Sequence, residues 1–401
     1  MKLKDILEGC LFTDGDWIES KDQDANGDIR LIQLSDIGDG YFVNKSKKFI
    51  NEETARKLRC TFLRKDDILI ARMPDPLGRA CLFPFEENNK YITAVDVCIL
   101  RPNDKCNNRY LQYCLNSPEI RSIINRQKTG TTRERITRKK LGELEIPFPS
   151  LKVQQKIVDI LDAADILRLN NKTLLIKYDT LAQSIFLHMF GDPVRNEKEW
   201  ECKTIEQLVR KEKNSIKRGP FGGALKKEIF VENGYLVYEQ FHALNNDFSM
   251  QRYFIDERKF NELKGFEVKS GDIIISCSGV YLGKLALVPK NSKQGIINQA
   301  LLKVTIDENI MRNDFFIFHF SHKNFRQKYF DSNRGAGIPN FPPMSEFKKF
   351  PFITPSLDLQ NQFAEKITLI EQQKELAKQE LKESEDLFNC LLQKAFKGEL
   401  T

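Results

Sequence analysis

Apolar side chains recur every three to four residues in two long stretches of the chain that contain neither proline nor glycine. In the first stretch they occupy two heptad positions: Val153, Ile160, Leu167, Leu174 and Leu181 on one, and Ile157, Ala164, Tyr178 and Ile185 on the other. A stripe with a 3.5-residue period predicts a helix that packs along another helix. Asn171 interrupts the second position, where a polar side chain can fix the register of the pair.

The second stretch carries a similar stripe near the end of the chain. Its apolar members are Phe363, Ile367, Ile370, Ala377, Leu381, Phe388 and Leu391, and Lys374 and Ser384 interrupt it. A helix of about 40 residues would be roughly 60 Å long, which is too long for an ordinary globular helix. We therefore predict that the two helices bury each other as an antiparallel coiled coil. The alternative is two unrelated amphipathic surface helices.

The segments ahead of the two helices also match each other. Two short β-rich runs joined by a glycine-containing loop occur in KDDILIARMPDPLGRACLFP (65–84) and again in SGDIIISCSGVYLGKLALVP (270–289). YITAVDVCILRP (91–102) and GIINQALLKVTI (295–306) each predict one further strand. The chain therefore reads as two copies of one strand-rich globular segment, each followed by a long helix.

Further matches lie at the entries to the helices. KTGTTRERI (128–136) parallels NRGAGIPNF (333–341), and both helices begin with the phrase PSL-x-x-Q, at Pro149 and at Pro355. A repeat of this size predicts tandem domains with pseudo-two-fold symmetry in a mixed α/β (α+β) fold. The predicted segments are a globular domain at 1–148, a helix at 149–192, a second globular domain at 193–354 and a second helix at 355–401.

Composition narrows the class of protein. The chain has 401 residues, of which 41% are hydrophobic, and this is enough for two or three cores. No apolar run is long enough to cross a membrane, and the nine cysteines contain no C-x-x-C pair. We therefore expect a soluble cytoplasmic protein with reduced thiols. The net charge is +7 and the basic excess lies outside the two helices, which suits a polyanionic partner or a solvated basic surface.

Three motifs resemble catalytic or metal sites but lack essential parts. GVYLGKL (279–285) is too short for a phosphate loop and has Leu285 where a magnesium-binding hydroxyl is needed. In NFPPM (340–344) an additional phenylalanine interrupts the Asn-Pro-Pro-aromatic motif of amino-methyltransferases. His319 and His322 have no neighbouring cysteine or histidine cluster, so an exposed or hydrogen-bonded pair is favoured over a metal site. The sequence indicates a binding protein without catalytic residues.

The strongest binding signal is the basic loop QKTGTTRERITRKK (127–140). Arg133, Arg135, Arg138 and Lys139 can contact phosphates, and arginine can also make bidentate contacts to guanine. The alternative is an exposed charge run. The matching loop of the second copy has only Arg334, and basic residues occur instead in KEKNSIKRGPFGG (211–223), including Lys217 and Arg218.

These features together resemble the specificity subunit of Type I restriction-modification systems over the whole chain. They are the two PSL-x-x-Q entries, the helices ending in FGD and FKGEL, and the phrases IKRGPFGGAL (216–225) and KTGTTRERI. The resemblance implies two target recognition domains that read the halves of a split double-stranded DNA site. It also implies a coiled coil that spaces them and docks two methyltransferase (modification) subunits. S-adenosylmethionine, ATP and magnesium would belong to those subunits and to restriction/translocase subunits, with no cofactor in this chain.

Individual DNA contacts are predicted for further residues of these domains. They are Arg30 and Gln33 in DIRLIQLSDIGDG (28–40), and Arg72 and Lys284 on the two glycine-containing loops. Two alternatives stay open. One is a non-enzymatic scaffold in which the helices dimerise. The other is an orphan or inactive specificity subunit.

Overall fold

The computed structural model describes residues 1–130, 133–221, 223–279, 281–330 and 341–400. It divides the chain into two compact units: Met1–Thr173 together with Lys378–Thr401, and Leu174–Ala377. We call them unit 1 and unit 2 and describe each by itself. Each contains one globular part and a section of both long helices, α6 (Leu151–Phe190) and α13 (Leu357–Lys397).

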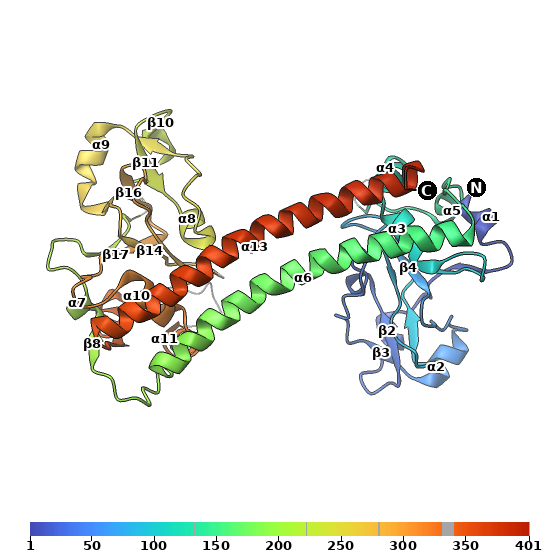
Figure 1. Ribbon diagram of the computed structural model, residues 1–401, viewed down its shortest axis with the longest axis horizontal. Helices are drawn as coiled ribbons and strands as arrows, with labels where there is room; N and C mark the ends of the chain where they lie inside the picture. The colour runs from blue at the N-terminus through green and yellow to red at the C-terminus, as the bar shows by residue number, and fades with distance from the viewer. Residues whose placement is uncertain (131–132, 222, 280, 331–340, 401) are drawn as a thin grey trace. The chain divides into compact units, whose positions relative to one another are not determined.

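The globular part of unit 1 is built on two small sheets (Figure 1). Its strands are β1 (Leu11–Asp14), β2 (Ile29–Ile32), β3 (Phe49–Ile50), β4 (Ile68–Ala71), β5 (Ala80–Leu82), β6 (Tyr91–Thr93) and β7 (Val97–Arg101). Its helices are α1 (Leu3–Ile6), α2 (Glu52–Lys57), α3 (Asn108–Asn116), α4 (Pro118–Arg126) and α5 (Arg138–Gly142). One sheet has the antiparallel order β1-β7-β4-β5, and the other has the order β3-β2-β6 with β2 and β6 parallel.

Unit 2 repeats this plan with additions. Its strands are β8 (Cys202–Thr204), β9 (Ile216–Arg218), β10 (Phe230–Val231), β11 (Tyr235–Tyr238), β12 (Phe254–Ile255), β13 (Glu267–Val268), β14 (Ile273–Ser276), β15 (Leu285–Leu287), β16 (Gly295–Ile297), β17 (Leu301–Val304) and β18 (Pro351–Ile353). Its helices are α7 (Ile205–Leu208), α8 (Gln240–Asn245), α9 (Glu257–Glu262), α10 (Asn313–Ser321), α11 (Lys323–Phe330) and α12 (Met344–Phe347). The sheet β9-β17-β14-β15 corresponds to β1-β7-β4-β5, and β12-β11-β16 corresponds to β3-β2-β6.

The predicted repeat is confirmed in the strand pairing. β4 pairs with β5, and β14 with β15, as antiparallel neighbours. The segments 91–102 and 295–306, in contrast, each form two strands rather than the one predicted, because a turn sends the first strand into the other sheet. Register then aligns the copies residue by residue. Ile70 and Asp14 both pair with Cys98, while Ile275 and Arg218 both pair with Leu302, so Asp14 and Arg218 are equivalent.

The cores of the units differ in composition. In unit 1, aliphatic side chains such as Ile68, Ile70 and Leu111 fill the space between the sheet and α3 and α4. In unit 2, phenylalanines dominate, and Phe186, Phe190, Phe315 and Phe363 contact one another where α6, α10 and α13 meet. Among the described residues no helix has both the length and the apolar character that crossing a membrane requires.

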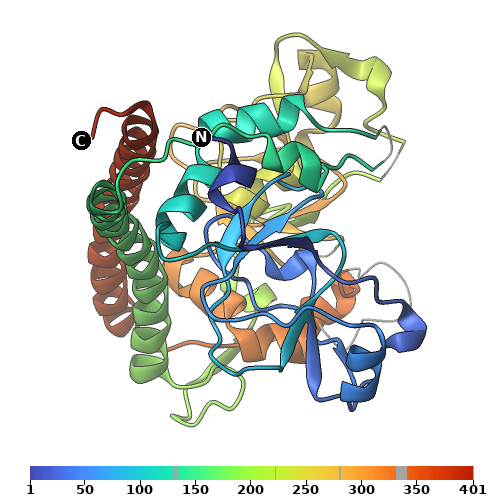
Figure 2. The ribbon, with the colours of Figure 1, turned by 90° about the vertical axis from the view of Figure 1, so that its right-hand side faces the viewer.

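α6 and α13 lie side by side in both views of the chain (Figures 1 and 2), and they run antiparallel in each unit. The predicted polar interruptions have partners. Asn171 donates to Ser384 Oγ and to the carbonyl of Glu380, both at 3.2 Å in unit 1. Lys374 pairs with Asp179 at 2.8 Å in unit 2.

One of the two predicted heptad positions of α6 is shifted by one residue in the buried seam between the helices. Ile157, Ala164 and Asn171 are buried, but Ile160, Leu167 and Leu181 are 38%, 46% and 45% exposed. Leu161 and Ala182 lie in the seam in place of their neighbours. The sequence has apolar residues at both 160 and 161, so periodicity alone could not choose between them. In α13, Phe363, Ile367, Ile370 and Phe388 are buried, and Leu381 and Leu391 are half-buried, as are Val153 and Leu174 in α6.

Candidate nucleic-acid interface

One end of the sheet β1-β7-β4-β5 gathers several loops of unit 1. β1 and β4 end there, and β5 and β7 begin there. The loops 15–28, 72–79 and 94–96 adjoin strands at this end, and the loop 127–137, which joins α4 to α5, is attached to it. We call these four loops the unit 1 rim; residues 131–132 lie outside the description. The backbone N–H of Ile136 donates to the carbonyl of Arg72 at 3.0 Å, which attaches the basic loop to the rim.

The predicted cations of the unit 1 rim fall into two groups. Arg72 is 8% exposed, forms an ion pair with Asp14 at 3.1 Å and donates to the carbonyl of Val95 at 2.8 Å. Arg138 donates to the carbonyl of Phe12 at 3.0 Å and is about half exposed. Both therefore hold the rim together.

Arg133 and Arg135 on the rim, and Lys139 in the adjoining helix α5, instead have exposed side chains. Reciprocal backbone hydrogen bonds at 2.9 and 2.8 Å join Thr129 to Arg135 across the basic loop. Arg133 and Arg135 therefore present charge to solvent close to these bonds, which suits contact with an extended anion.

Arg30 lies in β2, beside the rim, and Gln33 begins the turn that follows this strand. The carboxylate of Asp36 is fully buried there and accepts hydrogen bonds from the backbone N–H groups of Gln33 and Lys45. Arg30 contacts the same carboxylate at 3.3 Å. Sequence reasoning missed Arg79, whose guanidinium donates to the carbonyls of Ile37 and Leu34 and so ties this turn to the loop 72–79.

The unit 2 rim is the equivalent end of the sheet β9-β17-β14-β15. We define it as the loops 219–226, 277–284 and 298–300 with Phe341; residues 222, 280 and 331–340 lie outside the description, and with them the predicted Arg334. The N–H of Phe341 donates to the carbonyl of Cys277 at 3.1 Å, which matches the bond between Ile136 and Arg72. The predicted parallel between the loops ending at Ile136 and Phe341 is thereby confirmed at its described end.

The remaining cations of unit 2 lie at or next to this rim. Lys284 is exposed on the loop 277–284, and Arg218 ends β9. Lys217 places its ammonium group 4.8 Å from the ring centroid of Phe266. Sequence reasoning missed Gln240, which donates to Ser276 Oγ and to the carbonyl of Ser278, both at 2.6 Å, and so supports the loop.

A glycine follows the edge strand in both rims. A Cβ atom on Gly15 would lie 2.2 Å from the carbonyl oxygen of Ala94, and one on Gly219 would lie 1.8 Å from that of Asn298. No side chain fits at such distances, so both rims require a close backbone approach here. The residue before the glycine is Asp14 in unit 1 and Arg218 in unit 2, so the two rims share a backbone path and differ in charge.

Each rim belongs to a globular part that is attached to its helix by a buried glutamine of the PSL-x-x-Q phrase. Gln154 accepts from the backbone N–H of Asn107 at 2.9 Å and donates to the carbonyl of Pro149 at 2.9 Å. Gln360 makes the same pair of bonds with Arg312 and Pro355, both at 2.8 Å. Both glutamines are fully buried.

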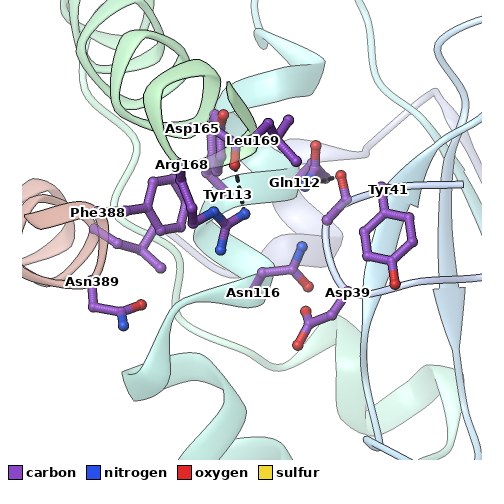
Figure 3. Close-up of a pocket in the computed structure, with 12 residues that line it drawn as sticks. Asp39, Tyr41, Gln112, Tyr113, Asn116, Asp165, Arg168, Leu169, Phe388 and Asn389 are labelled. Atoms are coloured by element: carbon purple, nitrogen blue, oxygen red, sulfur yellow. Dashed lines mark hydrogen bonds and ion pairs between the residues drawn. The ribbon is translucent and has the colours of Figure 1, made fainter. Parts of the chain in front are cut away.

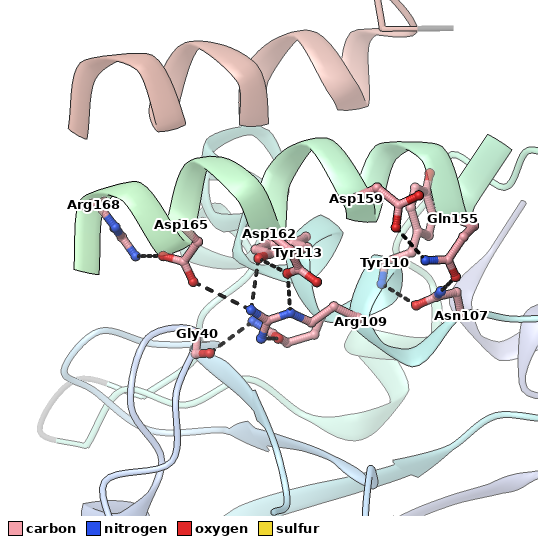
Figure 4. A network of polar contacts seen from close by, with 11 residues as sticks. Gly40, Asn107, Arg109, Tyr110, Tyr113, Gln155, Asp159, Asp162, Asp165 and Arg168 are labelled. Carbon is pink, nitrogen blue, oxygen red and sulfur yellow. Dashed lines mark hydrogen bonds and ion pairs between the residues drawn. The ribbon is translucent and has the colours of Figure 1, made fainter. Parts of the chain in front are cut away.

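In unit 1 a polar network strengthens this joint (Figure 4). Arg109 on α3 pairs with Asp162 at 2.9 Å and with Asp165 at 3.5 Å on α6. The hydroxyl of Tyr113 donates to Asp162 at 2.6 Å, and burial, followed by this bond, raises the pKa of Tyr113. The network fixes α3, and with it the sheet, against the helix.

A pocket of about 250 Å³ opens beside this network in unit 1 (Figure 3). Tyr41, Gln112 and Asn116 of the globular part line one side, and Arg168 and Phe388 of the helices line the other. The guanidinium of Arg168 lies 4.4 Å from the ring centroid of Phe388.

The histidine pair has a structural environment. His319 is fully buried, its Nε2 accepts from the backbone N–H of Ile353 at 3.2 Å, and burial lowers its pKa to about 3. Within the described ranges, no group of three or more histidine, cysteine, aspartate or glutamate side chains could hold a metal ion. Two of the motifs that resemble catalytic sites extend beyond the described residues: GVYLGKL (279–285) contains Val280, and NFPPM (340–344) contains Asn340.

The family model for the Type I restriction modification DNA specificity domain matches residues 1–177 and 197–385. The chain belongs to this family. Each of the two matched segments of the specificity domain contains one rim and part of a long helix. The fold predicted from the repeat, mixed α and β with two such domains and long helices that pack together, is confirmed.

Individual known proteins are also similar to this chain. The Type I restriction enzyme MjaIX specificity subunit of Methanocaldococcus jannaschii is 24% identical over 285 residues, which is 66% of this chain and 63% of that protein. The matched part thus spans less than two thirds of that relative. A solved chain described under "complex assembly and conformational transition of the type I R-M system" is 15% identical, with a TM-score of 0.63, over 100% of this chain and 97% of that one. The S subunit from M. genitalium is 17% identical, with a TM-score of 0.48, over 99% and 95%.

Proposed function

We propose that this chain is the DNA-recognition subunit of a Type I restriction-modification complex, and that each rim reads one half of a two-part DNA site. Family membership and the duplicated rim support this. The observation that carries it is the equivalence of Asp14 and Arg218 on one backbone path. In unit 1 this position holds a carboxylate that pairs with Arg72, whereas in unit 2 it holds an arginine, which can contact DNA phosphate. Two rims of like shape and unlike chemistry suit an asymmetric site.

The predicted contacts divide according to the bonds that the described side chains make. Arg133, Arg135 and Lys139 in unit 1 and Arg218 and Lys284 in unit 2 are the proposed DNA-contacting cations, together with Arg334. Arg72, Arg138, Arg30 and Gln33 act mainly by positioning the loops of the unit 1 rim, and Lys217 does the same at the unit 2 rim. Phosphate contacts set affinity and orientation, and base contacts add specificity.

Catalysis belongs to partner subunits in this proposal. Two methyltransferase subunits carrying S-adenosylmethionine would modify adenine, and restriction/translocase subunits using ATP and magnesium would cut DNA. The chain itself would hold no cofactor and would act in the cytoplasm. Exposed apolar side chains on the unit 1 section of α6, namely Ile160, Ile166, Leu167 and Leu169, support a docking surface for a partner.

Mapping methylated adenines across the genome with and without this chain tests the function. Loss of methylation at one two-part sequence, and at no other, is the expected result. If methylation is unchanged, the chain does not direct a methyltransferase. Methyl transfer by the isolated chain with S-adenosylmethionine would contradict its non-catalytic role.

A gel-shift titration with the purified chain tests the binding step separately. Affinity for a duplex that carries the mapped sequence should fall steeply as salt rises, because bound phosphates release counterions. Addition of methyltransferase subunits should strengthen binding. A chain that forms dimers but binds no duplex under any salt condition would be a scaffold instead.

A further inference from the structure

The turn after the edge strand carries an exposed aromatic ring in both rims. Because Asp14 and Arg218 are equivalent, Trp17 and Phe221 occupy the same position, three residues further along. Trp17 is 71% exposed and Phe221 is 88% exposed. Large aromatic side chains contribute to stability by burial, so an exposed ring at the tip of a fixed turn has no packing role. A second exposed ring, Tyr281 at 57%, lies on the loop 277–284 of the unit 2 rim.

The two turns carry opposite charge. Around Phe221 the chain places Lys217, Arg218, Lys226 and Lys227, and Lys284 lies on the neighbouring loop of the same rim. Around Trp17 the charges are mostly acidic, from Asp14, Asp16, Glu19 and Asp22, and the indole N–H of Trp17 points to Glu19 Oε1 at 3.4 Å. A DNA backbone attracts the first turn and repels the second.

The backbone at Phe221 is held in place without its ring. The carbonyl of Phe221 accepts from the N–H of Ala224 at 3.0 Å, and the N–H of Gly219 donates to the carbonyl of Leu301 at 2.8 Å. The close approach of Gly219 to Asn298 fixes the start of the turn. Removal of the ring therefore leaves the turn and the core intact.

We propose that Phe221 contacts the DNA bases directly, stacking on an exposed base or entering a base step, with Tyr281 as a second ring on the same rim. Arg218 and Lys284 would hold the phosphates on either side. Aromatic rings of this kind bind bases through their faces or act as wedges that unstack a step. This inference rests on the proposed function, because it concerns the DNA half-site read by unit 2. Trp17, in its acidic turn, makes no such contact.

The test uses the full chain and a fluorescent duplex that carries the mapped sequence, with 2-aminopurine substituted in turn at positions of each half-site. Phe221→Ala should weaken binding by about 5- to 150-fold, the range of losing one stacked base. It should also abolish the change in 2-aminopurine fluorescence on binding, and should do so in one half-site only. Phe221→Trp should retain the affinity and the 2-aminopurine fluorescence change. Trp17→Ala is the matched control and should bind DNA as tightly as the unchanged chain does.

The slope of affinity against salt separates this contact from a phosphate contact. Phe221→Ala should leave the slope unchanged, whereas Arg218→Ala should reduce it. If Phe221→Ala binds as tightly as the unchanged chain, or if Trp17→Ala weakens binding equally, the inference is wrong while the proposed function stands. If Phe221→Ala weakens only the binding of methyltransferase subunits, the ring contacts protein and the inference is also wrong. If the unchanged chain binds no duplex, the proposed function itself fails.

Discussion

Gln154 on α6 accepts a hydrogen bond at 2.9 Å from the backbone N–H of Asn107, a residue 47 positions earlier at the start of α3. The same side chain donates to the carbonyl of Pro149, so one buried amide satisfies two backbone groups that water does not reach. Gln360 repeats both bonds in unit 2. The repeated glutamine of the PSL-x-x-Q phrase is therefore the attachment between each globular part and its helix.

Gln154→Ala should destabilise unit 1, because the N–H of Asn107 and the carbonyl of Pro149 would lose their partner. Each unsatisfied buried group costs about 1–3 kcal/mol. Urea unfolding should show this loss, and Gln360→Ala should show a similar one. Gln379→Ala on the exposed side of α13 is the matched control and should change the free energy of unfolding by less than about 0.5 kcal/mol. Equal effects of all three variants would contradict the role of the glutamine.

The pair Asn171 and Ser384 should set the alignment of the helices in unit 1. Asn171→Leu combined with Ser384→Ala should raise the free energy of unfolding by roughly 1 kcal/mol, because two polar groups leave an apolar seam. The same double variant should allow the helices to slip. Disulfide cross-linking between cysteines introduced at neighbouring seam positions measures this. If the double variant still cross-links at only one pair of positions, the helices have not slipped, and other residues set their alignment.

Protonation of His319 should destabilise the fold in acid. Burial lowers the pKa of this imidazole to about 3, while in the unfolded chain the pKa returns to about 6.5. The unfolded state therefore binds the proton first, and the contribution is fully present above about pH 6.5 and is lost as the pH falls toward about 3. The expected loss approaches about 1.4 kcal/mol per pH unit within this window.

Urea unfolding between these pH values gives the slope for His319. His319→Gln should flatten the pH dependence even if it lowers stability overall. His188→Gln, at an exposed position of α6, should leave the slope as it is. If the free energy of unfolding of His319→Gln depends on pH as steeply as that of the unchanged chain, other groups take up the protons.

Arg133 and Arg72 should respond to alanine substitution in opposite ways. Arg133→Ala, combined with Arg135→Ala, should weaken DNA binding and reduce its salt slope by about two, with little change in stability. Arg72→Ala should lower stability by about 1–3 kcal/mol, because the carbonyl of Val95 loses its donor and the partly exposed carboxylate of Asp14 keeps only Arg138, at 4.0 Å. Arg56→Ala on α2 is the control for exposed arginines. If the variant with both Arg133→Ala and Arg135→Ala binds DNA normally, the basic loop is not part of the proposed interface.

The sequence predicted the repeat, both helices and the matching loops because these depend on local periodicity and on order along the chain. It could not place the seam of α6, since Ile160 and Leu161 are equally apolar and only tertiary packing chooses Leu161. Nor could it separate a buried positioning arginine from an exposed one. Arg72 and Arg133 look alike in a basic chain, and Arg79 looks like a surface residue until its bonds to Ile37 and Leu34 are seen.

The joints also bear on how such a chain can be recombined. Both helices present the same glutamine amide, so a foreign globular part must at least place a backbone N–H where this amide can accept from it. Beyond the glutamine the two joints differ. In unit 1 an arginine and a tyrosine of the globular part contact Asp162, whereas in unit 2 Phe315 and Phe318 of α10 contact Phe363. A transplanted domain should therefore fit its own position in the chain better than the other position.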